Sequence, residues 1–143
     1  MSASDLAQVI EEYHQGLDAF VKGDPEPVLR LVSRRDDVTL ANPLGLPARG
    51  WDQVEKAAQV AASQSREGAF IGFETISEYA TSDLAYNLEI QRTQGKLGGA
   101  DEMSPISLRV TTVFRREDDG WRIVHRHADP ITSPRPIESV VDR

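Results

Sequence analysis

The spacing of apolar residues changes at about residue 68, and this change is the strongest constraint on the fold. Before it, apolar side chains recur every three or four residues, as on one face of an amphipathic helix. The first such stripe consists of Leu6, Val9, Ile10, Tyr13, Leu17, Phe20 and Val21. After it, apolar and polar residues alternate, which is typical of half-buried strands. We therefore predict an α+β fold, with N-terminal helices packed on one face of an antiparallel sheet.

The same spacing, together with turn residues, predicts the individual elements. Helices are expected over residues 5–22, in a short segment beginning at Pro25, and over residues 51–65. Strands are expected over residues 38–41, 70–79, 84–91, 106–114 and 121–129. Residues 43–50 are expected to form a loop because they contain two glycines and two prolines. Asp118-Asp119-Gly120 predicts a tight hairpin turn.

Chain length favours one domain. The 143 residues are close to the usual size of a single domain, and 39% of them are hydrophobic, which is too apolar for a disordered chain. We expect one domain over residues 1–143, with its core at about 5–129. The proline-rich segment 130–143 is predicted to be an extended C-terminal tail.

Charge and cysteine content exclude several classes of function. The net charge of −7 argues against nucleic acid or an anionic membrane as the main partner, because both need clustered lysine and arginine. The absence of cysteine rules out disulfides, thiol nucleophiles and cysteine-bound zinc. The N-terminus lacks the basic head and apolar run of a signal peptide, and no segment approaches the roughly 20 apolar residues of a membrane span. We predict a cytoplasmic protein.

The last predicted strand carries the most suggestive polar residues, which are His125, His127 and Asp129. Regular alternation would put all three on one face with Trp121 and Ile123, and thus in any pocket on that face. Histidine suits acid/base catalysis near neutral pH, and a carboxylate can fix its tautomer, so we take these three as candidate catalytic residues. Alternatively, the histidines bond to neighbouring strands or lie in a subunit interface. His-x-His could supply two metal ligands, but no third ligand is evident and no metal is predicted.

Several short strings, in this order, resemble the SnoaL-like and ketosteroid isomerase-like group of the nuclear transport factor two superfamily. They are Gly23-Asp24, residues 37–43, residues 49–52 and residues 120–127. The last of them, with residues 112–116, is also similar to the calmodulin-dependent kinase association domain. The resemblance covers residues 5–129. It implies a cone-shaped, curved antiparallel or mixed sheet wrapped around the N-terminal helices, with a pocket at its open end. This fold serves isomerases, dehydratases, cyclases and non-catalytic assembly domains, so it does not settle function.

Three positions test the resemblance to ketosteroid isomerases. Those enzymes have an Asp base before a proline after the first strand, where this chain has Asn42-Pro43. Their hydrogen-bonding tyrosine falls near Gly16, and their neutral aspartic acid falls at Thr112. The base and both donors are therefore missing, and isomerisation of 3-oxosteroids by that mechanism is not expected. Asn42 can only donate or accept hydrogen bonds.

Two kinds of function remain open from the sequence. We favour a pocket protein that binds a small hydrophobic, carbonyl-containing molecule without a cofactor. Its candidate ligand contacts are Asn42, Tyr13, Trp51, Tyr86 and Thr112. The alternatives are a cofactor-independent isomerase, dehydratase or cyclase using His125, His127 and Asp129, or a non-catalytic dimerisation module.

Assembly as a homodimer is also predicted, through the outer face of the sheet. Antiparallel sheets usually leave one face polar and wet. Here Val113 and Val124 fall opposite the presumed core face, beside Thr111, Arg122 and Arg126. This apolar content predicts a covered surface.

Overall fold

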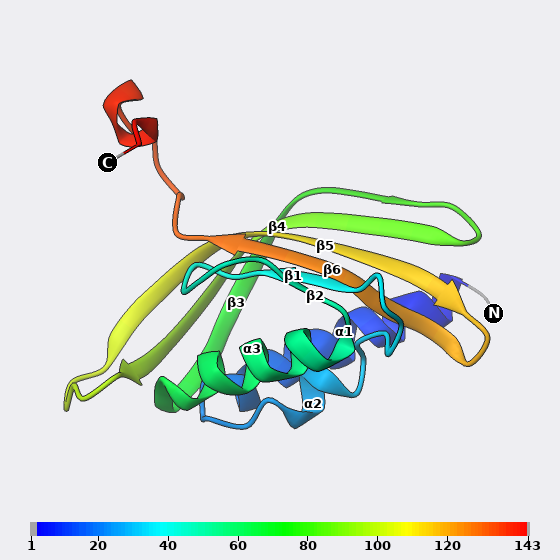
Figure 1. The fold of residues 1–143 in the computed structure, drawn as a ribbon, viewed down its shortest axis with the longest axis horizontal. Helices are drawn as coiled ribbons and strands as arrows, with labels where there is room; N and C mark the ends of the chain where they lie inside the picture. Colours follow the sequence, from blue (N-terminus) through cyan, green and yellow to red (C-terminus); the bar gives the residue numbers. More distant parts are fainter. Residues whose placement is uncertain (1–2, 143) are drawn as a thin grey trace.

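The computed structural model describes residues 3–142, with side chains from residue 5 onward, and in them a six-stranded sheet curves over the helices (Figure 1). The helices are α1 (Ala3–Phe20), α2 (Glu26–Leu29) and α3 (Trp51–Ser63), with a 3-10 turn, η1, at Ile137–Val140. The strands are β1 (Thr39–Ala41), β2 (Ala48–Arg49), β3 (Ser65–Ala80), β4 (Leu84–Leu97), β5 (Ser104–Glu117) and β6 (Gly120–Asp129). Residues 1–2 and 143 of the predicted domain lie outside the described part.

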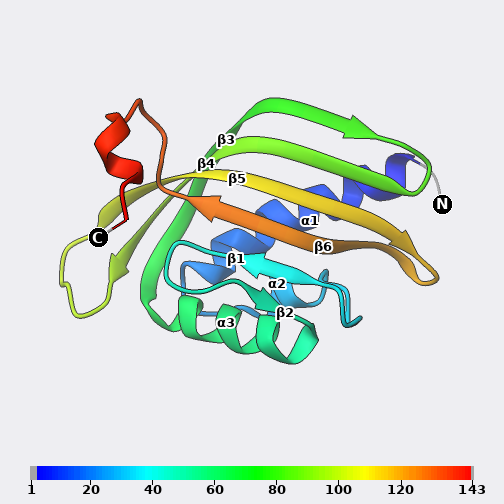
Figure 2. The same cartoon turned by 45° about the horizontal axis from the view of Figure 1, so that its top comes forward.

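The strand order is β2-β1-β6-β5-β4-β3, and every neighbouring pair is antiparallel except β1 with β6. The sheet is therefore mixed and open. Figures 1 and 2 show α1, α2 and α3 together on its concave side. The predicted α+β class and the curved sheet around N-terminal helices are confirmed.

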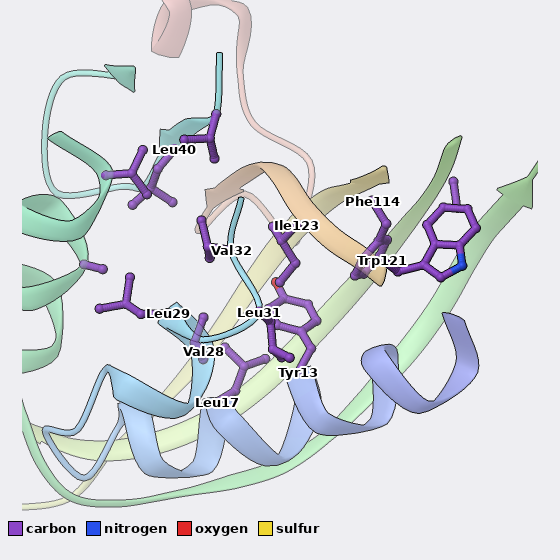
Figure 3. Close-up of a cluster of buried hydrophobic side chains, with 14 of the residues drawn as sticks. Tyr13, Leu17, Val28, Leu29, Leu31, Val32, Leu40, Phe114, Trp121 and Ile123 are labelled. Atoms are coloured by element: carbon purple, nitrogen blue, oxygen red, sulfur yellow. The ribbon is translucent and has the colours of Figure 1, made fainter. Parts of the chain in front are cut away.

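Helix α1 is buried along the stripe that its sequence predicts. Leu6, Tyr13 and Leu17 belong to the hydrophobic core, and Tyr13 is 0% exposed. Figure 3 shows Tyr13 rising from α1 towards Ile123 on β6. An apolar face of this width needs a partner surface. The inner face of the sheet provides that surface.

Several segments differ from expectation. Strands β3 and β4 are longer than predicted, because they span Ser65–Ala80 and Leu84–Leu97 instead of 70–79 and 84–91. The segment 43–50, predicted to be a loop, contains the short strand β2, which pairs antiparallel with β1 at Thr39↔Arg49 and Leu40↔Ala48. The tail beyond residue 130 is not wholly extended, because it ends in η1, and it projects away from the sheet in Figure 1. In the described part of the chain, no helix combines the length and apolarity needed to cross a membrane.

Strand β4 turns its polar side inward. Ala85, Asn87, Glu89 and Gln91 are all buried, whereas Leu84 and Tyr86 of the same strand are exposed. Alternation identifies a strand but not which of its faces is covered. The inner wall of the fold therefore contains amide and carboxylate groups that must find partners.

A β-bulge in β6 reverses which residues point inward. Val113 pairs with His125 and the next residue of β5, Phe114, pairs with Ile123, so Val124 is an extra residue in β6. Such an extra residue shifts the alternation by one position. Before the bulge, Ile123 lies opposite the buried Phe114 and points inward. Beyond the bulge, the inward residues are Arg126 and Ala128, which lie opposite the buried Thr112 and Val110.

The bulge places His125 on the outer face, next to the parallel strand β1. Its Nδ1 lies 2.7 Å from Thr39 Oγ1, so the ring links β6 to β1. Partial burial lowers the pKa of His125 from its ordinary value, because it disfavours the charged ring, and the nearby His127 acts in the same direction.

Cysteine labelling should detect the reversal, since the chain has no native cysteine. In His127→Cys the thiol replaces an outward side chain that is 54% exposed, and it should react quickly with a maleimide. In Ala128→Cys the thiol replaces a buried side chain and should react at least about tenfold more slowly, because access requires local opening. A straight strand would give the opposite order of rates.

The lowered pKa of His125 predicts a pH dependence of stability. The unfolded chain, with an ordinary histidine pKa of about 6.5, binds the proton more readily than the folded chain. The neutral ring therefore contributes stability at pH values above the pKa of the unfolded chain. This contribution is lost as the pH falls through the lower pKa that His125 has in the folded chain. Replacing His125 by Gln should therefore flatten the decline in the urea midpoint from about pH 7 to pH 5. An unchanged decline in the variant would contradict this assignment.

Candidate functional site

A cavity of about 380 Å³ lies between the helices and the concave face of the sheet. We call it the first cavity. Its apolar walls include Leu17 and Phe20 of α1, Leu29 of α2, Val54 of α3, Leu108 of β5 and Ile123 of β6. Its lining also includes the exposed side chains of Leu44, between β1 and β2, and Leu97, at the end of β4. The cavity therefore reaches the surface between that loop and the end of β4.

The polar end of the first cavity is built by Arg126, Tyr13 and Gln91. Arg126 Nη1 donates hydrogen bonds to the Tyr13 hydroxyl and, over 3.0 Å, to Gln91 Oε1. The Tyr13 oxygen also lies 3.0 Å from Thr112 Oγ1, so the hydroxyl that accepts from Arg126 can donate to Thr112. These bonds hold a guanidinium group at the wall of an otherwise apolar space.

Arg126 differs from the other arginines of β5 and β6 that face carboxylates. Arg109 pairs with Asp129 at 2.9 Å, Arg115 with Asp37 at 2.8 Å, and Arg122 with Asp119 at 2.6 Å. Within residues 3–142, no carboxylate comes within 4.0 Å of the Arg126 nitrogens. Among these residues, its hydrogen-bond acceptors are the neutral oxygens of Tyr13 and Gln91, and its guanidinium lies 5.8 Å from the centroid of the Tyr13 ring.

The hydrogen bonds continue from Gln91 to a buried acidic group. Gln91 Nε2 donates to Glu89 Oε1 over 2.8 Å, and the same oxygen lies 2.7 Å from His14 Nε2. Glu89 is 1% exposed, and His14 is buried as well. A buried carboxylate needs such partners, because an unpaired charge in the interior is costly. The network thus joins the guanidinium of Arg126 to the carboxyl group of Glu89 through one amide.

The predicted ligand contacts are only partly brought together. Tyr13 and Asn42 line the first cavity, and Thr112 lies behind Tyr13 as its hydrogen-bond partner. Trp51 is not part of the lining; it starts α3, with the Arg34 guanidinium 3.6 Å above its ring. Tyr86 faces outward and stacks on Tyr79, with ring centroids 6.4 Å apart, so its expected place in the pocket wall is wrong.

The structure contradicts the placement of His125, His127 and Asp129 in a pocket. The bulge turns all three to the outer face of the sheet, and none of them lines the first cavity. His127 Nε2 lies 3.5 Å from Asp129 Oδ2, while Asp129 accepts three hydrogen bonds from Arg109, at 2.9 Å, 3.1 Å and 3.3 Å. These contacts are those of a surface ion pair. They leave the proposed acid/base role without the geometry it needs.

Sequence reasoning missed the residues that do form the polar network. Regular alternation places Arg126 on the outer face, and His14 falls off the apolar stripe of α1, so neither is selected from the sequence as a site residue. The available signal was the regular series Asn87, Glu89 and Gln91, whose polar side chains share one face of β4. That series becomes informative only when the polar face is known to be the inner one.

A sequence profile of the SnoaL-like domain family matches residues 7–132. The solved structure of a nuclear transport factor 2-like protein from Salmonella enterica superimposes with a TM-score of 0.76 at 17% identity, covering 94% of both chains. A ketosteroid isomerase-like protein from Erwinia carotovora atroseptica gives 0.72 at 16% identity, covering 92% of this chain and 96% of the other.

A third structure is a Thiobacillus denitrificans protein provisionally named a calcium/calmodulin-dependent protein kinase type II association domain. Its TM-score is 0.67 at 23% identity, covering 87% of this chain and 93% of that one. Likeness at these identities establishes the fold alone. Comparison with curated proteins finds no match. The profile covers most of the chain and the structures share its architecture, so the chain belongs to the SnoaL-like domain family of the nuclear transport factor 2-like fold.

Proposed function

We propose that the first cavity binds a small apolar molecule that carries a carbonyl or carboxylate oxygen. The observation that carries this proposal is the guanidinium of Arg126, which reaches an apolar cavity and has no carboxylate partner in the described part of the chain. Charge-assisted bonds from arginine to an oxygen acceptor are among the stronger hydrogen bonds in proteins. The Tyr13 hydroxyl beside it accepts from Arg126 and bonds to Thr112, and so holds the guanidinium in place at this end of the cavity.

The apolar walls account for the other end of such a ligand. Burial of apolar surface contributes roughly 25 cal/mol per Å², so a ligand that fills this cavity gains most of its affinity from its hydrocarbon part. A few polar groups at one end then fix its orientation. The expected ligand is therefore amphipathic, with one polar end.

Binding is favoured over proton transfer because of what lines the first cavity. None of its described lining residues is an aspartate, glutamate or histidine. These are the side chains that most often act as general bases near neutral pH. A cofactor-independent isomerase, dehydratase or cyclase would need such a group in contact with its substrate. A binding role in the cytoplasm, without a cofactor, is the proposal that remains.

The outer face of the sheet favours a second role in assembly. Tyr79, Tyr86 and Val113 form one row across β3, β4 and β5, with Leu88 and Ile90 beside them on β4. Apolar residues on the uncovered side of a sheet commonly mark a protein interface. We propose that this face joins two copies of the chain.

Calorimetry with matched ligands would test the binding proposal. Octanoate should bind at least about tenfold more tightly than 1-octanol, because only the carboxylate forms charge-assisted bonds with Arg126. Arg126→Met should remove this preference and keep the affinity for octanol. Arg92→Met is the matched control, since Arg92 faces outward and pairs with Glu74 at 3.7 Å. Equal affinity of the native protein for both ligands would refute the proposed role of Arg126.

Light scattering coupled to size exclusion would test the assembly proposal. The native chain should elute with the mass of a dimer, and Tyr86→Asp should yield monomers, because it would bury a charge at the interface. Leu46→Asp is the control, since Leu46 is 92% exposed in the loop between β1 and β2 and belongs to none of the strands β3, β4 and β5 that carry the row. A native monomer at all working concentrations would rule out the dimer.

A further inference from the structure

A second cavity, of about 630 Å³, lies on the other side of α1 from the first. It is bounded by α1, β3 and β4, and none of its lining residues also lines the first cavity. The proposed ligand of the first cavity does not account for it. Its lining has a different chemical character.

The charged groups around the second cavity are mainly acidic. Glu11, Asp18, Glu78 and Glu89 line it, and none of its described lining residues is a lysine or arginine. Asp18 is already engaged by Lys22 at 2.6 Å and by the Phe70 backbone N–H at 2.8 Å. The remaining carboxylates create a negative potential in a chain whose net charge is −7.

A buried amide in this wall lacks a partner. Asn87 is 3% exposed and lines the second cavity, and its Oδ1 has no hydrogen-bond partner. Buried polar atoms without partners are rare, and each needs an explanation. An amide oxygen can only accept hydrogen bonds. The ligand that satisfies it must donate a hydrogen bond.

Glu89 offers a second acceptor in the same wall. Both of its hydrogen bonds, from Gln91 and with His14, involve Oε1. Among the described residues, Oε2 has no hydrogen-bond partner. Asn87 and Glu89 are two residues apart on β4 and face the same side, so one donor group can reach both.

An aromatic surface completes the second cavity. The ring of Phe73 stacks on His14, with centroids 4.0 Å apart and planes inclined by 16°. Phe73 is nevertheless 49% exposed, which leaves ring surface open to a ligand. This open ring surface can pack against the apolar part of an organic cation, while the carboxyl groups nearby attract its charge.

We propose that the second cavity is a binding site for a small organic ammonium ion, with the ammonium group held by Asn87 and Glu89 and its apolar part against Phe73. An ammonium group provides both features that the wall requires, a positive charge and several hydrogen-bond donors. The site is separate from the carbonyl-binding first cavity. Its existence does not depend on that proposal.

Calorimetry with 2-phenylethylamine, supported by amide shifts in ¹⁵N NMR spectra, would test the site. The amine should bind at least about fivefold more tightly than its uncharged analogue 2-phenylethanol, and it should shift signals from β3 and β4 around Phe73 and Asn87. Asn87→Leu should weaken amine binding by about fivefold, because it removes the acceptor while keeping the shape of the side chain. Glu89→Gln should weaken it in the same direction.

Two further variants separate binding from folding and from the first cavity. Asn87→Leu should unfold at no lower temperature than the native chain, since an apolar side chain replaces an unpartnered polar one. Glu102→Gln, in the exposed loop between β4 and β5, is the charge-matched control and should leave amine affinity unchanged. Arg126→Met should lose octanoate binding and keep the preference of the second cavity for amine over alcohol, because Asn87 and Glu89 are unchanged. Equal affinity for amine and alcohol, an unaffected Asn87→Leu variant, or shifts confined to the first cavity would each overturn the proposal.

Discussion

Tyr13 fixes the position of α1 against the sheet, and the rest of the interior is arranged around it. Its ring is fully buried and meets Phe114 edge-on, with centroids 6.1 Å apart and planes inclined by 81°. Its hydroxyl bonds to both Thr112 and Arg126, which come from different strands. Each such bond contributes about 1 kcal/mol net, but a buried partner left unsatisfied costs about 1–3 kcal/mol. A shift of the helix by one turn would break both bonds, so this contact determines where α1 lies and where Arg126 points.

The polar inner face of β4 stabilises the fold less readily than an apolar face would. Apolar residues at positions 87, 89 and 91 would pack without any need for partners, whereas Asn87, Glu89 and Gln91 must be hydrogen-bonded to be buried. Replacing buried charged groups by well-packed apolar ones is often neutral or stabilising in proteins. The network from His14 to Arg126 is therefore poorly explained as a device for stability. It is explained if its polar atoms face ligands, as the two cavities on either side of α1 indicate.

The sequence predicts the elements of this fold well and the faces of its strands poorly. Spacing identifies α1, α3 and the long strands, because burial requires a continuous apolar stripe whichever surface covers it. It cannot say which side of β4 is covered, because Tyr86, Leu88 and Ile90 would suit a core as well as a subunit interface. The bulge at Val124 is harder still to predict, because neither of its neighbours in the chain is a glycine or a proline. Because of this one extra residue, Arg126 points into the pocket wall and His125 and His127 point away from it. The predicted catalytic residues were therefore misplaced.

Gln91 links the electrostatics of the two cavities. Its amide oxygen accepts from Arg126 and its amide nitrogen donates to Glu89, so the orientation of one side chain serves a guanidinium on one side and a carboxyl group on the other. An anion that draws Arg126 away from Gln91 would leave that oxygen short of a donor and so weaken the arrangement that holds Glu89. By thermodynamic reciprocity, any effect of a ligand in the first cavity on affinity in the second is matched by an equal effect in return. Because the link is a chain of side-chain hydrogen bonds, such coupling would require no movement of the backbone.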